Sequence, residues 1–144
     1  MKLVITYWSG TGNTRAMAEA LETGAKDAGA EVVLREADGA SADSTLSGDV
    51  AALGCPAMGS EVLEEDIMEP LVAEIEKKGL AGKKILLFGS YDWGDGEWLR
   101  NWEERMVAAG AIMAFPPIAV HNAPEDGDLS MLADTGRKLA GFKA

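Results

Sequence analysis

The chain has 144 residues, a length that suits one domain spanning residues 1–144. Its formal net charge of −11 predicts a surface that repels nucleic acid and anionic membranes, and that either attracts basic partners or serves solubility alone. The single cysteine excludes an intramolecular disulfide and a cysteine-cluster metal site, and no apolar run approaches the roughly 20 residues of a membrane span. The apolar run near the N-terminus is too short for a signal-peptide core, so we expect a cytoplasmic protein. Nothing in the sequence suggests an obligate interface, so we expect a monomer.

Five apolar runs in chain order predict strands, at residues 3–7, 32–34, 50–53, 85–88 and 112–120. Four of them lack strict alternation of polar and apolar residues, which is typical of strands buried on both faces of a parallel sheet. Pro116 and Pro117 interrupt the last run. Residues 38–48 form the weakest part of the pattern, where we expect a surface connection with at most one helical turn.

Four stretches between these runs repeat apolar residues at helical spacing. The four apolar stripes are Met17, Leu21 and Ala25; Ile67, Leu71 and Ile75; Trp98, Trp102 and Met106; and Leu129, Leu132, Gly136 and Leu139. Gly29 and Gly110 stand where the C-caps of the first and third of these helices would fall. The alternation of strand and helix predicts a single α/β domain with right-handed crossovers.

Glycine-bearing loops follow three of the predicted strands, at residues 8–14, 54–61 and 89–96. In a doubly wound sheet, ligands bind beyond the carboxyl ends of the strands, so these loops are the candidates for a site. The first loop contains Ser9-Gly10-Thr11-Gly12-Asn13-Thr14 and opens a helix, which favours a phosphate. It has no Lys or Arg, which separates it from the P-loop and leaves a monophosphate ester or an ordinary strand-to-helix turn.

The other two loops offer flat or polarizable apolar groups, Met58 in one and Tyr91 and Trp93 in the other. Such groups pack well against a planar ring. Together the three loops predict a phosphate site beside a slot for a planar ring. Trp98 and Trp102 lie four residues apart on a predicted helix, so we expect them in the core instead.

The chain resembles the flavodoxins, and most closely the short-chain flavodoxins of anaerobic bacteria. The segments that carry the resemblance, besides the phosphate loop, are Tyr7-Trp8, Ala57-Met58-Gly59 with Glu61, Phe88-Gly89-Ser90-Tyr91, Trp93-Gly94-Asp95-Gly96 and Glu103-Glu104-Arg105-Met106. The resemblance covers nearly the whole chain, without the insertion that long-chain relatives carry in the last strand. It implies a flavodoxin-like three-layer α/β sandwich with a five-stranded parallel sheet of strand order 2-1-3-4-5.

The resemblance also implies noncovalently bound FMN and a low-potential one-electron carrier that shuttles between the semiquinone and the hydroquinone. It implies that Trp93 and Met58 cover the two faces of the isoalloxazine and that Glu61 accepts a hydrogen bond from flavin N3. The alternatives are a Trp93 half-buried under its loop and a solvated Glu61. The implied FMN-binding residues are Trp8, Ser9, Gly10, Thr11, Gly12, Asn13, Thr14, Pro56, Ala57, Met58, Gly59, Ser60, Glu61, Ser90, Tyr91, Asp92, Trp93 and Gly94.

In flavodoxins the second loop also supplies a peptide that turns over on reduction, here the one between Gly59 and Ser60. Residues 58–61 can form a type II′ turn with Gly59 at positive φ, or a type II turn with Ser60 at positive φ. A left-handed conformation costs a residue with a Cβ roughly 1–2 kcal/mol. We therefore expect Ser60 to make the one-electron-reduced form less stable than a glycine would.

Four single residues carry expectations of their own, and the first three have two interpretations each. We expect Cys55 to be a small buried residue and not a redox thiol, because no cationic neighbour lowers its pKa. Arg15 is expected to point to solvent and not to the phosphate. His121 is expected to be a surface residue, in preference to one that contacts a loop near the flavin. Asp92 replaces a glycine of the short-chain relatives and would place a carboxylate beside the ring.

An acidic rim around the flavin edge is expected to dock redox proteins, reductases and oxidoreductases, through their basic patches. The rim candidates are Glu61, Glu64, Glu65, Asp92, Asp95 and Glu97. Glu64, Glu65 and Asp66 continue a charge run, so we expect these three to face water. The alternative function is an FMN-dependent NAD(P)H or quinone reductase, although short loops leave little wall for a second ligand. A phosphorylated receiver domain lacks support, because Leu53-Gly54-Cys55 stands where that class needs an aspartate.

Overall fold

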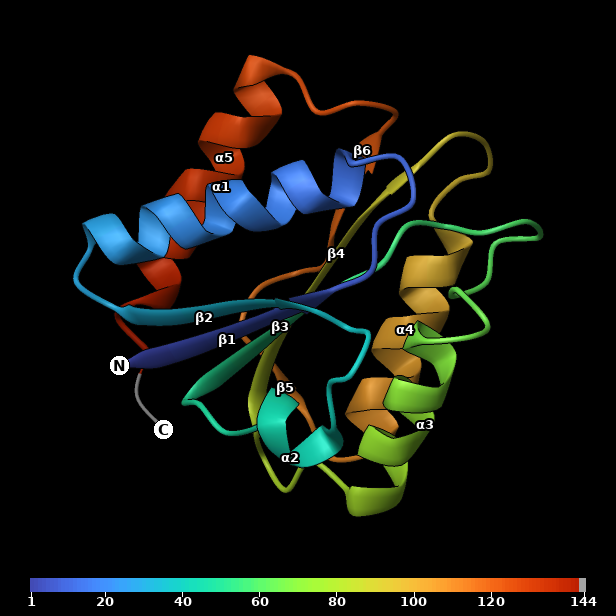
Figure 1. The fold of residues 1–144 in the computed structure, drawn as a ribbon, viewed down its shortest axis with the longest axis horizontal. Coiled ribbons are helices and arrows are strands. Elements are labelled where there is room, and N and C mark those ends of the chain that lie inside the picture. The colour runs from blue at the N-terminus through green and yellow to red at the C-terminus, as the bar shows by residue number, and fades with distance from the viewer. Residues whose placement is uncertain (143–144) are drawn as a thin grey trace.

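The computed structural model describes residues 1–142, which form one parallel β-sheet with helices on both faces (Figure 1). The strands are β1 (Lys2–Tyr7), β2 (Glu31–Glu36), β3 (Val50–Gly54), β4 (Lys84–Tyr91), β5 (Ile112–Met113) and β6 (Ile118–His121). Their order, β2-β1-β3-β4-β5, is the predicted one. Because the strands pair in parallel, their carboxyl ends meet at one edge of the sheet.

Two short strands, β5 and β6, share the position at the edge of the sheet beside β4. Ile112 of β5 pairs with Lys84 at the start of β4, whereas Ile118 of β6 pairs with Phe88 further along. Pro116 and Pro117 lie between the two strands, and a proline has no N–H to donate to a ladder. The prediction of one strand over residues 112–120 is therefore wrong, although both short strands lie at the predicted place in the strand order, beside β4.

Helices α1 (Asn13–Asp27) and α5 (Asp126–Leu139) cover one face of the sheet. Helices α2 (Ala42–Thr45), α3 (Met68–Lys78) and α4 (Glu97–Ala108) cover the other face (Figure 1). The single turn of α2 lies within the predicted surface connection. Gly29 and Gly110 follow the C-caps of α1 and α4 at φ 91° and 106°, as predicted. Over residues 1–142 no helix is long and apolar enough to cross a membrane.

Helices α1 and α5 cross at two glycines. A Cβ on Gly24 of α1 would overlap the backbone carbonyl of Ala133 in α5, and a Cβ on Gly136 would overlap the carbonyl of Leu21 in α1. The two backbones are therefore in direct contact, which lets both helices pack tightly on the sheet. The core on this face includes Leu3, Ile5, Met17, Leu86, Phe88 and Leu132, all fully buried.

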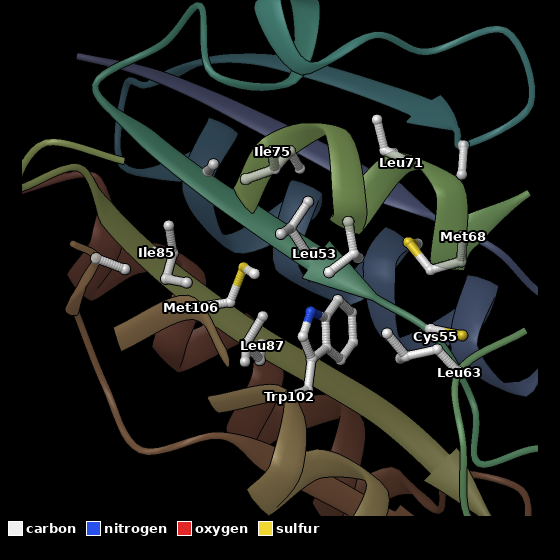
Figure 2. Close-up of a cluster of buried hydrophobic side chains, with 14 of the residues drawn as sticks. Leu53, Cys55, Leu63, Met68, Leu71, Ile75, Ile85, Leu87, Trp102 and Met106 are labelled. Atoms are coloured by element: carbon white, nitrogen blue, oxygen red, sulfur yellow. The ribbon is translucent and has the colours of Figure 1, made fainter. Parts of the chain in front are cut away.

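The second core lies between the sheet and helices α3 and α4. Trp102 extends from α4 among Leu53, Leu87 and Met106 (Figure 2). Trp98 and Trp102 are each 1% exposed, so the prediction that both belong to the core is confirmed. Cys55 is fully buried in the same cluster, and burial raises the pKa of its thiol to about 12. The prediction that Cys55 is a small buried residue is confirmed as well.

Candidate functional site

Helix α1 begins directly after the first loop, and its N-cap residue has no side chain with which to cap the helix. Its N-cap is Gly12 at φ 96°, a left-handed conformation that glycine adopts without steric cost. The first turn of α1 holds no acidic residue, whereas α3, α4 and α5 have Glu69, Glu97 and Asp126 in theirs. The N–H groups and the dipole of α1 therefore favour an anion at this end.

Hydroxyl groups hold the loop before α1 in shape. Ser9 Oγ accepts hydrogen bonds from the N–H of Gly12 at 3.1 Å and of Arg15 at 3.3 Å. Thr11 Oγ1 accepts from the N–H of Asn13 at 3.4 Å. A hydroxyl that accepts such bonds still has its own O–H to donate. The loop can therefore offer neutral donors to a phosphate without losing its conformation.

The next two residues of α1, Thr14 and Arg15, have different surroundings. Thr14 is 1% exposed, and its Oγ1 lies 3.2 Å from Ser90 Oγ, which ties α1 to the end of β4. The Arg15 side chain pairs with Glu19, with Nε 3.9 Å from Oε2, and is 60% exposed. The prediction that Arg15 points to solvent is confirmed.

A cavity of about 250 Å³ opens at the carboxyl edge of the sheet, where the three predicted loops meet. Its lining residues are Trp8, Gly10, Thr11, Asn13, Pro56, Ala57, Met58, Gly59, Ser90, Tyr91 and Asp92. Each of them was predicted from the sequence as a site residue. Seven other predicted site residues lie outside the lining: Ser9, Gly12, Thr14, Ser60, Glu61, Trp93 and Gly94. The structure thus brings all three loops to one cavity, with part of the predicted set behind its wall or at its edge.

The second loop closes between Met58 and Val62, one residue later than the predicted turn. The N–H of Met58 donates to the carbonyl of Val62 at 2.9 Å, and the N–H of Val62 donates back at 3.1 Å. Gly59 is left-handed at φ 42°, as one of the two predicted turns requires, and Ser60 is not. Glu61 is left-handed at φ 56°, which was not predicted and costs a residue with a Cβ roughly 1–2 kcal/mol.

The carboxylate of Glu61 explains how the loop keeps this conformation, because it caps the start of α4. Oε1 accepts from the N–H of Gly96 at 3.3 Å, and Oε2 accepts from the N–H of Glu97 at 3.2 Å. Gly94 passes so close that a Cβ there would overlap the carboxylate. Glu61 is only 7% exposed, so its predicted place on an exposed docking rim is wrong. Its hydrogen bond to a flavin N3 stays a prediction.

Glu64 also caps a helix, and the prediction that it faces water as part of the docking rim is wrong. Its carboxylate accepts from the N–H groups of Asp66 at 2.7 Å, Ile67 at 2.8 Å and Met68 at 2.9 Å, at the start of α3. It is only 6% exposed. Burial opposes ionisation of Glu64, but the three backbone hydrogen bonds outweigh burial and lower its pKa. Glu65 and Asp66 are exposed, as predicted.

The third loop, which is confined to residues 92–96 because β4 extends to Tyr91, carries Trp93, which is 62% exposed. Asp92 is also exposed and is not left-handed, so its backbone does not require the glycine of the relatives. His121 is exposed, yet its Nε2 lies 2.8 Å from the carbonyl oxygen of Asp92. His121 is therefore a surface residue, as preferred, and it also contacts the third loop, as the alternative has it. The sequence held no signal for this contact, which arises because β6 pairs His121 with Tyr91.

The doubly wound sheet and its carboxyl-edge cavity define an α/β protein that binds a nucleotide with a phosphate and a planar ring. The flavodoxin family profile matches residues 5–136. The chain is 44% identical to the flavodoxin of Clostridium beijerinckii over 136 residues, which are 94% of this chain and 97% of the relative. It is 46% identical to the flavodoxin of Megasphaera elsdenii over 132 residues, which are 90% and 96% of the two chains. This chain belongs to the flavodoxin family.

The solved structures agree with this assignment. The solution structure of two-electron reduced Megasphaera elsdenii flavodoxin has a TM-score of 0.83 to this chain at 43% identity, covering 94% of this chain and 98% of that one. A flavodoxin from the domain Archaea has a TM-score of 0.87 at 26% identity, covering 97% and 96%. The protein is thus an FMN-binding electron carrier and not an enzyme, which decides against the alternative of a reductase.

The residues at the cavity fit FMN. The start of α1, with no acidic residue in its first turn and hydroxyls before it, suits a phosphate. Trp8, Met58 and Tyr91 in the lining suit a planar apolar ring. Within residues 1–142 no group of three or more His, Cys, Asp or Glu could hold a metal ion.

Proposed function

We propose that this protein is a low-potential one-electron carrier that shuttles its FMN between the semiquinone and the hydroquinone. FMN supplies the reversible electron chemistry, and the residues of the chain set how readily the ring takes up negative charge. The observation that carries the proposal is the charge of the cavity wall. Among the described residues that line the cavity, Asp92 is the one with a charged side chain.

An added negative charge on the ring meets no lining cation to stabilise it and one carboxylate to repel it. The fully reduced, anionic state of FMN is therefore disfavoured, which makes it a strong electron donor. The net charge of −11 acts in the same direction. Both effects support a low potential for the second electron.

Potentiometry of Asp92→Asn tests this proposal. A unit charge at about 8 Å in an effective dielectric of about 40 contributes about 1 kcal/mol, which is about 45 mV for one electron. We expect the semiquinone/hydroquinone potential to rise by about this amount when the carboxylate is neutralised. Glu104→Gln, which removes one charge from the exposed side of α4, is the control and should shift it far less. Equal shifts for the two variants would contradict the role of the cavity wall.

The proposed phosphate site is the loop of residues 9–14 with the start of α1. The hydroxyls of Ser9 and Thr11 and the dipole at the start of α1 support it. Thr11→Val removes one donor that lines the cavity. We expect it to raise the Kd for FMN by about tenfold and to leave the Kd for riboflavin, which lacks the phosphate, unchanged. An equal loss for both flavins would contradict this assignment.

The proposed ring site lies between Met58 on one face and Trp93 on the other, with Glu61 accepting from flavin N3. Met58 lines the cavity, and the 62% exposed Trp93 offers apolar surface that a ring would cover. The carboxylate of Glu61 accepts two backbone hydrogen bonds and has lone pairs for a third. The remaining predicted site residues shape the loops that hold these groups.

The proposed docking surface for redox partners is the exposed acidic rim with two exposed apolar side chains. Its residues are Val62, Glu65, Asp92, Trp93, Asp95 and Glu97. Basic patches of reductases and oxidoreductases would be steered to it, so electron-transfer rates should fall as salt rises. Rates that stay flat across ionic strength would contradict this surface. We further propose a monomer in the reducing cytoplasm, to be checked by light scattering and by fractionation of cells.

A further inference from the structure

The end of β6 supports the wall of the proposed FMN cavity. Strand β6 pairs with β4 from Ile118 beside Phe88 to His121 beside Tyr91. Tyr91 and the following Asp92 line the cavity, and there the chain leaves the sheet for the loop that carries Trp93. His121 and its neighbour thus lie behind the point where the third loop begins.

The carbonyl groups of Tyr91 and Asp92 both have hydrogen-bond partners at the end of β6. The N–H of Asn122 donates to the carbonyl of Tyr91 at 2.8 Å, and His121 Nε2 lies 2.8 Å from the carbonyl oxygen of Asp92. The imidazole also contacts the Tyr91 ring, with centroids 5.1 Å apart and planes inclined by 45°. Tyr91 in turn lies 5.7 Å from the buried Trp98 ring. A continuous set of contacts therefore connects the exposed imidazole to the core behind the cavity.

The chemistry of the His121 contact is fixed by its partner. A backbone carbonyl can only accept, so Nε2 must carry the proton that is donated to Asp92. Nδ1 is then free to accept, and the Asn122 side-chain Nδ2 lies 3.5 Å from it. An imidazole in this tautomer is a donor to the loop without needing a charge.

The third loop is held at both ends by side chains from other elements. At its far end the Glu61 carboxylate binds the N–H groups of Gly96 and Glu97. At its near end we infer that His121 is a positioning residue for the FMN site, which fixes the carbonyl of Asp92 and so the place from which Trp93 extends. The contribution comes from the N–H donor and not from the charge of the ring. This inference rests on the proposed position of FMN in the cavity.

Two variants separate the donor from the bulk of the side chain. His121→Leu introduces an apolar side chain of similar size and removes the donor, whereas His121→Gln keeps an N–H donor without a ring. We expect His121→Leu to raise the Kd for FMN by about fivefold and His121→Gln to stay within about twofold of the parent. Glu104→Gln is the surface control. If His121→Leu fails to fold, His121→Ala removes the same donor without exposing a longer apolar chain.

A second readout is the backbone order of the third loop in the FMN-loaded protein. NMR order parameters of residues 92–95 should fall in His121→Leu and recover in His121→Gln, while those of β4 stay unchanged. The inference is overturned if His121→Leu binds FMN like the parent, or if His121→Gln is as weak as His121→Leu. If Thr11→Val raises the Kd for FMN but His121→Leu does not, this inference alone is overturned. If neither variant changes the Kd for FMN, the proposed FMN site is overturned.

Discussion

Replacing Glu64 by alanine should destabilise the protein near its binding loops. The carboxylate serves three backbone N–H groups at the start of α3, at 2.7, 2.8 and 2.9 Å, in a position that is 6% exposed. Loss of a helix cap costs about 0.5–2 kcal/mol, and a hydrogen bond to a charged group contributes about 1.5–3 kcal/mol net of its exchange with water. Water can reach some of the freed N–H groups, so we expect a loss of about 2 kcal/mol at pH 7.

The pH dependence of this loss follows from the lowered pKa of Glu64. A carboxyl whose pKa is lower in the folded state stabilises the fold above its unfolded pKa, near 4.3 in model peptides, and the effect is lost as pH falls through the folded pKa. The difference between parent and Glu64→Ala should therefore be full at pH 7 and shrink below about pH 4.

The assay is urea unfolding of the FMN-free protein, so that cofactor binding does not add to the measured stability. Glu65→Ala is the matched control, because Glu65 is the exposed neighbour in the same charge run. It should change the free energy of unfolding by less than about 0.5 kcal/mol. Equal losses for the two variants at pH 7, or a Glu64 loss that does not shrink in acid, would refute the capping argument.

Three further predictions concern the packing of α1 on α5, the buried thiol and the turn at Ser60. Gly24→Ala should cost about 2–3 kcal/mol in urea unfolding, because its Cβ would overlap the Ala133 carbonyl, whereas Gly127→Ala, with open space around it, should be neutral or stabilising. With a thiol pKa of about 12, Cys55 should resist an alkylating reagent at pH 8 until the protein is unfolded. Ser60→Gly should raise the oxidised/semiquinone potential by about 40–80 mV, and potentiometry that finds no upward shift would contradict the strain assigned to Ser60.

The regular part of the fold could be predicted from the sequence because it depends on apolar periodicity. The apolar runs and the helical stripes report on burial, which the residue types encode directly, and Gly29 and Gly110 report on the left-handed backbone that follows a helix. The three loops could be located because parallel strands deliver their carboxyl ends to one edge. Pro116 and Pro117 did signal an interruption, but not that both halves would still pair with β4.

The errors at the site concern the direction of side chains in irregular backbone. Glu61 and Glu64 stand in a run of acids that looks solvated, yet each turns inward to cap a different helix. A left-handed Glu61 is unusual for a residue with a Cβ, so local propensity argued against it. His121 binds the Asp92 carbonyl because of strand register, which no short motif records. Contacts between segments distant in sequence decided the positions of Glu61 and His121, whereas Glu64 binds N–H groups only two to four residues ahead of it.

The measurement that most directly tests the proposed function is an anaerobic reductive titration of the FMN-loaded protein, followed by visible absorbance. A one-electron carrier should accumulate a blue neutral semiquinone before it bleaches. That result would agree with stabilised one-electron chemistry of the bound FMN. Bleaching directly from yellow to colourless, with no blue species at any stage, would contradict it.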